Sequence, residues 1–68
     1  MTYKLTVIDH QNIEKIYYYN DFDDIVTFLA KEGIVIPSRW NYNDKKELVY
    51  ATWKHIDHHS RAIMEVIE

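Results

Sequence analysis

Cysteine is absent from this 68-residue chain, and glycine and proline occur only once each. Without cysteine the chain forms neither a disulfide nor a thiolate metal site, so its fold depends on an apolar core or on oligomerisation. A glycine-rich phosphate loop is excluded by the single Gly33. Ser38 and Ser60 stand outside any glycine elbow, so the sequence carries no nucleophile motif. Because a chain this small has little room for a substrate pocket, we predict a protein that is not an enzyme and uses no cofactor.

Long apolar runs and positive charge are also scarce. No apolar run approaches the roughly 18 residues that a membrane-spanning helix needs, and the first ten residues lack the pattern of a signal peptide. These absences predict a cytoplasmic protein without membrane association. Eight Lys and Arg residues stand against 11 Asp and Glu residues, which gives a net charge of −3 at pH 7. This acidic balance argues against nucleic-acid binding, which gains affinity when basic side chains neutralise phosphates.

Apolar and aromatic residues, by contrast, are plentiful at 47% and 15% of the chain. This composition predicts a folded protein, and the length predicts one domain over residues 1–68. Residues 2–9 alternate with a period of two, and residues 13–19 are rich in β-branched and aromatic residues, so both segments read as strands. The polar residues 10–12 between them predict a β-hairpin. The apolar face of the first strand comprises Tyr3, Leu5 and Val7.

A helix is predicted over residues 21–33, where the apolar spacing changes from two to i, i+3, i+4 and i+7. Asn20 or Asp21 is suited to cap its first turn, and Gly33 is suited to the left-handed cap that ends it. Pro37 prevents the helix from continuing. The apolar stripe consists of Phe22, Ile25, Val26 and Leu29.

The segment 38–68 admits two interpretations. Apolar residues spaced four and three apart suit one long C-terminal helix over 43–68. The stretch "VYATWKHI", however, is dense in strand-forming residues, and "DHHS" would place four indifferent helix formers in the middle of that helix. The second interpretation is therefore favoured: an α+β fold of order ββαβββ, with an antiparallel sheet covered on one face by the single helix. The alternative is ββα followed by the helix 43–68.

Two stretches echo each other, "VIDHQNIEKI" at 7–16 and "HIDHHSRAIM" at 55–64. Asp-His followed by two polar residues is turn chemistry, so the echo is interpreted as two hairpin corners. Three of the four histidines cluster here, and His55, His58 and His59 are weak candidates for metal ligands. Two histidines do not complete a zinc site, and Asp9 or His10 would supply a third ligand only if the two turns meet in space. The sequence therefore predicts no metal site, with a histidine-dependent metal protein as a minor alternative.

Protein binding is the predicted function. If Ile16 and Tyr18 lie beneath the helix, Tyr17 and Tyr19 face outward, and with Tyr50 they form an aromatic surface of the kind found at interface cores. One helix cannot cover both faces of a sheet, so a protein partner or a second copy is expected, and a homodimer is predicted. The acidic helix start offers a further contact for a basic partner. Its carboxylates are Asp21, Asp23 and Asp24.

A small nucleic-acid-binding regulator is the alternative function. Trp40 and Arg39 would form a stacking platform for bases, and Lys45 and Lys46 would add positive charge in the next turn. In its size, lack of cysteine and richness in Tyr and Asp, the chain resembles the small accessory proteins of bacteriophages and mobile elements, which include inhibitors of host enzymes. That resemblance implies an accessory or inhibitory role, and it assigns no function to any single residue.

Overall fold

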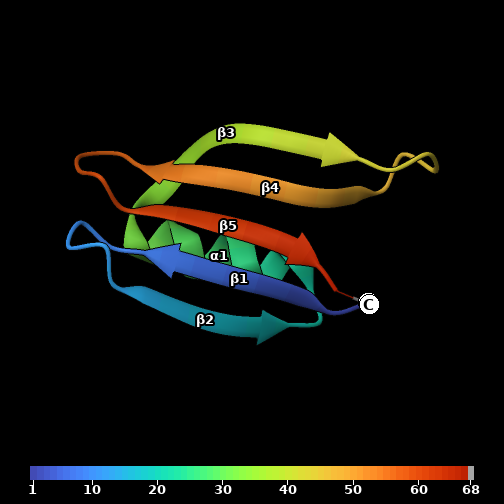
Figure 1. Ribbon diagram of the computed structural model, residues 1–68, viewed down its shortest axis with the longest axis horizontal. Helices are drawn as coiled ribbons and strands as arrows, with labels where there is room; N and C mark the ends of the chain where they lie inside the picture. Colours follow the sequence, from blue (N-terminus) through green and yellow to red (C-terminus); the bar gives the residue numbers. More distant parts are fainter. Residues whose placement is uncertain (68) are drawn as a thin grey trace.

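A computed structural model describes residues 1–67 and shows five strands and one helix. The strands are β1 (Tyr3–Ile8), β2 (Glu14–Tyr19), β3 (Ile34–Tyr42), β4 (Leu48–His55) and β5 (Arg61–Val66), and the helix is α1 (Phe22–Glu32). All strand pairs are antiparallel, and their order in the sheet is β2-β1-β5-β4-β3. Figure 1 shows α1 crossing one face of this sheet behind β1 and β5. The predicted α+β fold of order ββαβββ is confirmed.

The C-terminal segment forms strands, so the alternative of a helix over 43–68 is wrong. β4 and β5 bury every second residue, and the buried positions pair directly across the two strands. Ala51 lies opposite Met64, and Trp53 lies opposite Ala62. These four residues are at most 5% exposed, so the period-two burial of a half-covered sheet outweighs the helical spacing seen in the sequence.

β3 begins at Ile34, before the segment 38–68 in which the sequence places the last three strands. Pro37 lies inside β3, and this is tolerated because β3 is an edge strand whose outer side needs no ladder hydrogen bonds. Register shifts interrupt its pairing with β4 at three places along the strand. Ile34 is 2% exposed, because the strand packs against the end of the helix as soon as it leaves the cap.

α1 begins and ends where the sequence predicts. The Asp21 carboxylate accepts a hydrogen bond from the backbone N–H of Asp23 at 2.9 Å, which caps the first turn. Gly33 adopts a left-handed conformation with φ of 76°, and its N–H donates to the Ala30 carbonyl. The helix buries Ile25 and Leu29 against the sheet.

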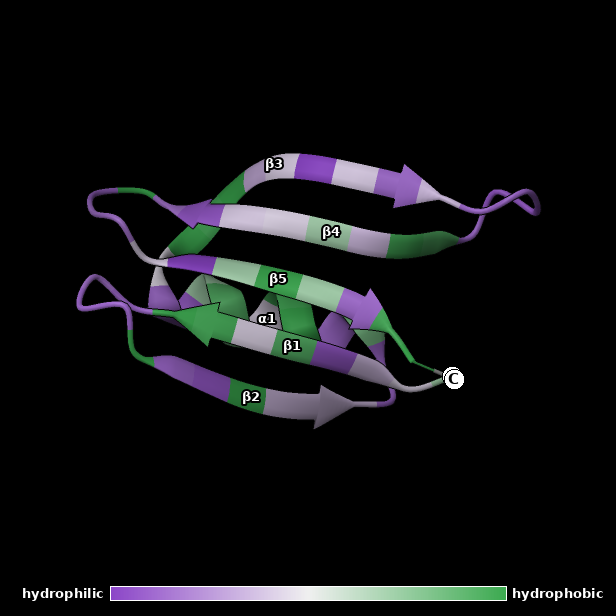
Figure 2. Cartoon of the chain, in the orientation of Figure 1, coloured by the Kyte–Doolittle hydropathy of each residue, from purple (hydrophilic) through white to green (hydrophobic). Residues whose placement is uncertain are grey.

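The core lies between α1 and one face of the sheet. Its apolar residues come from the helix and from all strands except β2, and each is less than a tenth exposed. Aromatic rings surround the margin of this core. Figure 2 shows the resulting alternation of hydrophobic and hydrophilic residues along the strands. The buried cluster consists of Leu5, Ile25, Leu29, Ile34, Ala51, Trp53, Ala62 and Met64.

The orientation expected for β2 is wrong. Tyr17 lies directly opposite Leu5, and Tyr19 lies opposite Tyr3, so both tyrosines share the face that α1 covers. Their rings lie 4.9 Å and 6.3 Å from the ring of Phe28, measured between centroids. Partial burial next to Tyr17 and Asp24 also raises the pKa of the Tyr19 hydroxyl, with loss of water as the largest cause. Because apolar residues occupy both sides of this strand, sequence periodicity alone does not select its inner face.

Trp40 is also turned inward, which corrects the predicted stacking platform. It pairs with Ala51 in the register and packs on Trp53 at 5.6 Å and on Phe22 at 6.1 Å between ring centroids. Arg39, its neighbour in the sequence, points to the opposite face because adjacent strand residues alternate. The structure therefore separates the two residues that the nucleic-acid interpretation placed together. Within residues 1–67, no helix has the length and apolar character needed to cross a membrane.

Candidate functional site: the open sheet face and the histidine corner

The sheet face opposite α1 has no segment of the described chain over it (Figure 1). We call it the open face. Its residues follow from the register, in which direct partners on neighbouring strands point the same way. From β2 to β3 they form three rows: Tyr18, Lys4, Glu65, Tyr50, Asn41; Ile16, Thr6, Ile63, Thr52, Arg39; and Glu14, Ile8, Arg61, Lys54, Ile36.

Apolar side chains remain exposed on the open face. Tyr18 is 62% exposed, Ile16 is 49% exposed, and Ile36 is 44% exposed. Ile63 and Tyr50 are half-buried between them on the central strands. An exposed aromatic and aliphatic surface of this kind, on a face without a covering layer, is typical of a contact surface.

The charge of the open face is opposite in sign to that of the whole chain. Four of the eight basic residues lie on it, together with two of the 11 acidic residues, which gives a local net charge of +2. Since the chain carries −3 in total, the residues outside this face sum to −5 in the sequence. The basic residues are Lys4, Arg39, Lys54 and Arg61, and the acidic ones are Glu14 and Glu65.

The two turns that echo each other in sequence lie at the same end of the sheet. β1 ends at Ile8, and β5 begins at Arg61, and these two residues are direct partners in the register. The turns are therefore neighbours, and the rings of His10 and His58 lie 5.3 Å apart between centroids. We call the group formed by His10, His55, His58 and His59 the histidine corner.

The first turn is held by a carboxylate. Asp9 accepts hydrogen bonds from the backbone N–H groups of Gln11 at 2.8 Å and Ile13 at 3.0 Å. These two bonds lower the pKa of Asp9, because they favour its charged form. Asn12 takes a left-handed conformation with φ of 64°, which closes the hairpin.

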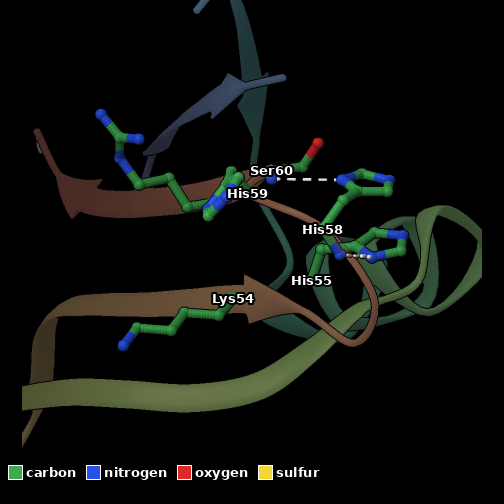
Figure 3. A pocket seen from close by; sticks show the side chains of 6 residues that line it. Lys54, His55, His58, His59 and Ser60 are labelled. Atoms are coloured by element: carbon green, nitrogen blue, oxygen red, sulfur yellow. Dashed lines mark hydrogen bonds between the residues drawn. The ribbon is translucent and has the colours of Figure 1, made fainter. Parts of the chain in front are cut away.

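The second turn is held by histidine rings instead. Nδ1 of His55 accepts from the backbone N–H of Asp57 at 2.9 Å and of His58 at 3.3 Å. Nδ1 of His58 accepts from the backbone N–H of Ser60 at 3.3 Å. Figure 3 shows the bonds donated by His58 and Ser60, and the two rings lying against each other. The ring centroids are 3.5 Å apart, and the ring planes are 15° apart.

The two turns that are similar in sequence are therefore held by different groups, a carboxylate in the first and histidine rings in the second. The structural twin of the first turn is the β3–β4 turn, in which Asn43 accepts from the N–H groups of Lys45 and Glu47, both at 2.9 Å. Lys46 there has the same φ of 64° as Asn12. The shared feature is an Asp or Asn side chain followed three residues later by a left-handed residue, a pattern that the Asp-His echo obscures.

The histidine corner does not form a metal site within the described residues. Among residues 1–67, no group of three or more His, Asp or Glu side chains converges on a point where a metal ion could sit. In His55 and His58, Nδ1 is already occupied by backbone N–H donors, and stacked rings cannot direct both remaining nitrogens at one ion. No observation on the described chain therefore supports the metal-binding alternative.

Next to the stacked histidines lies a hollow of about 280 Å³. Its lining comes from the end of β4, the β4–β5 turn and the start of β5. Figure 3 shows Lys54 extending from the end of β4, with His59 and Ser60 at the start of β5. The six lining residues are Lys54, His55, His58, His59, Ser60 and Arg61, and none of them is acidic.

We expect the histidine corner to make stability pH-dependent. The pKa of His58 is lowered, first by loss of water around the ring and then by His55 and His10, whereas Asp57 acts in the opposite direction. The unfolded chain therefore binds a proton at His58 more readily than the folded chain, so stability falls as pH decreases from about 6.5 through the lower folded pKa. Asp9 affects stability in a lower pH range. Because its pKa is lowered in the folded chain, its contribution to stability is lost only as pH falls below its ordinary pKa of 3.8.

The check is thermal unfolding between pH 5 and pH 7.5 for the wild type and His58→Asn. Asparagine keeps an acceptor for the Ser60 N–H but does not titrate. We expect a smaller decrease of Tm at low pH in the variant than in the wild type. Equal decreases in both proteins would show that His58 does not carry this pH dependence.

The residues that the sequence proposes for partner binding are divided between surfaces. Tyr50 lies on the open face, whereas Tyr17 and Tyr19 lie under α1. The three aspartates lie at the exposed start of α1, where Asp21 is the N-cap and Asp23 and Asp24 occupy the first turn. Lys45 and Lys46 lie in the β3–β4 turn, at the other end of β4 from the histidine corner.

Sequence reasoning missed Ile16, Tyr18, Lys54 and Arg61 as surface residues. Only the register places their side chains on the open face. One signal was available, because Tyr3, Leu5 and Val7 share the covered face. The length of the turn between β1 and β2 then decides which residues of β2 join them on that face.

In comparisons with known proteins, no family model matches the chain, and no curated protein or solved structure matches it either. Functional inference therefore depends on the geometry of the chain itself.

Proposed function

We propose that this chain is a small non-enzymatic binding protein that contacts another protein through the open face. The observation that carries this proposal is a sheet face that exposes Tyr18, Ile16 and Ile36 and that no segment among residues 1–67 covers. Burial of exposed apolar surface is the main driving force of protein association, at roughly 25 cal/mol for each Å² of apolar area. Burial of the apolar side chains of the open face would therefore favour binding of a partner, and that role needs no cofactor or catalytic group.

The charge of the open face indicates the chemistry of the partner. A net charge of +2 on this face favours a partner whose contact surface is acidic. A second copy fits poorly face to face, because it would place a net charge of +2 against a net charge of +2. The two acidic residues Glu14 and Glu65, and the net −5 on the rest of the chain, oppose a uniformly negative polymer such as nucleic acid. A protein surface can present both signs of charge and so fits best.

The test is affinity capture from a bacterial lysate with two matched double variants. Tyr18→Ser/Arg39→Gln removes one apolar group and one cation from the open face. Val26→Ser/Lys31→Gln removes the same kinds of group from α1, where Val26 is 44% exposed and Lys31 is exposed. We expect one protein to be captured by the wild type and the α1 variant, to be lost by the open-face variant, and to dissociate as salt rises.

Three results would contradict the proposal. Capture that survives in the open-face variant would place the contact elsewhere, and capture of nuclease-sensitive material would make nucleic acid the partner. Capture of no protein, with a dimer in light scattering that the open-face variant abolishes, would make a second copy the occupant. Circular dichroism of both variants establishes that they remain folded.

A further inference from the structure

The hollow at the β4–β5 turn has an unusual lining. It is lined by two basic side chains, Lys54 and Arg61, with three histidines and a serine, and none of these six lining residues carries a carboxylate. Glu14 shares a row with these cations but lies on β2, separated from β5 by β1. A volume of about 280 Å³ is ample for a small polyatomic ion or the terminal group of a larger ligand.

Lys54 and Arg61 are direct cross-strand partners. Like charges directly opposite each other in an antiparallel pair destabilise the sheet, because the side chains lie close together on the same face. A bound anion between them would convert this repulsion into two charge-assisted contacts.

Three histidines line the turn end of the hollow. Because Nδ1 of His58 accepts the Ser60 N–H, the neutral ring carries its proton on Nε2, which makes that nitrogen a donor. His55 has the same arrangement at Nδ1, and its Nε2 lies against the helix cap, where a Cβ on Gly33 would come within 2.7 Å. The rings that are fixed in place thus cannot offer a free Nδ1 to a cation.

We propose that the hollow lined by Lys54 and Arg61 at the β4–β5 turn is a binding site for a phosphate-type oxyanion. The ligand is free phosphate or a terminal phosphate group on a larger molecule, since both present the same tetrahedral oxygens to Lys and Arg. Binding at this site does not depend on the proposed protein partner. It uses one end of the open face, whereas the contact tested above uses Tyr18 and Arg39.

The experiment is a titration of the full chain with inorganic phosphate, followed by amide and histidine NMR signals at pH 7. Sodium chloride at matched ionic strength is the reference. We expect saturable shifts concentrated in residues 54–61, at least a fivefold weaker affinity in Lys54→Gln and in Arg61→Gln, and unchanged affinity in Lys31→Gln. Saturation with phosphate should also move the titration of His58 to higher pH, because a bound anion favours the protonated ring.

Each outcome of the titration either supports or overturns the phosphate site. Shifts that follow ionic strength without saturating, or equal affinity in the wild type and both site variants, would overturn the site. A phosphoserine peptide and a short 5′-phosphorylated oligonucleotide, each beside its unphosphorylated form, identify the source: tighter binding of one phosphorylated form assigns the ligand. Because the open-face variant Tyr18→Ser/Arg39→Gln keeps Lys54 and Arg61, it should retain phosphate binding even if it loses the protein partner.

Discussion

Ile25→Ala is expected to remove a third or more of the stability of the folded protein. Ile25 is fully buried on the inner face of α1, and truncation of a buried isoleucine to alanine costs about 3 kcal/mol through lost burial and a residual cavity. A chain of this length has a stability of only about 3–10 kcal/mol. Urea unfolding followed by tryptophan fluorescence measures the loss, which should move the midpoint far toward zero denaturant.

Val26→Ala is the matched control on the same helix. Val26 is the next residue and is 44% exposed, so its truncation creates no buried cavity, and alanine is the better helix former. Its stability should change by less than about 0.5 kcal/mol. A loss in Ile25→Ala no larger than that of Val26→Ala would mean that α1 does not pack on the sheet through this face.

The second large effect is expected for the double substitution Tyr17→Ser/Tyr19→Ser. Both rings pack on Phe28 beneath the helix. Their removal takes away the aromatic side chains on the covered face of β2, which is an edge strand. We expect a loss of about 3 kcal/mol from lost apolar burial and aromatic contact. For a domain of this size that loss corresponds to a decrease in Tm of more than about 10 °C, measured by circular dichroism.

Tyr18→Ser is the control for the opposite face of β2. Tyr18 lies between these tyrosines in sequence but is 62% exposed on the open face. Its removal should lower Tm by less than about 5 °C, because only strand preference and partial contacts are lost. If Tyr18→Ser proved as damaging as the double variant, the register that places Tyr17 and Tyr19 under α1 would be wrong.

Those elements whose signals are local could be predicted from the sequence. The helix, with its Asp21 and Gly33 caps, is specified by neighbours within one or two turns, and the structure confirms it. The hairpin corners near residues 10–12, 43–46 and 57–60 likewise follow from short polar segments between strand-forming runs. Even the choice of strands over a C-terminal helix followed from residue preferences between 48 and 56.

The candidate sites, by contrast, required the tertiary structure. β2 carries apolar residues on both sides, so only its pairing with β1 decides that Tyr18 is exposed and Tyr17 is covered. The β1–β5 contact joins segments at opposite ends of the chain, and it alone brings His10 beside His58. Lys54 and Arg61 are seven positions apart in sequence, and only the hairpin register makes them partners around one hollow.

The physical reason is the range of each interaction. Helix caps, turns and strand preference act between residues a few positions apart, so the amino-acid sequence determines them directly. Which face of a strand is inside, and which side chains meet across strands, depends on contacts between distant segments, where a shift of one residue reverses every side chain. For this protein the sequence determined the α+β order and its turns, and the pairing of strands decided where a partner or an anion could bind.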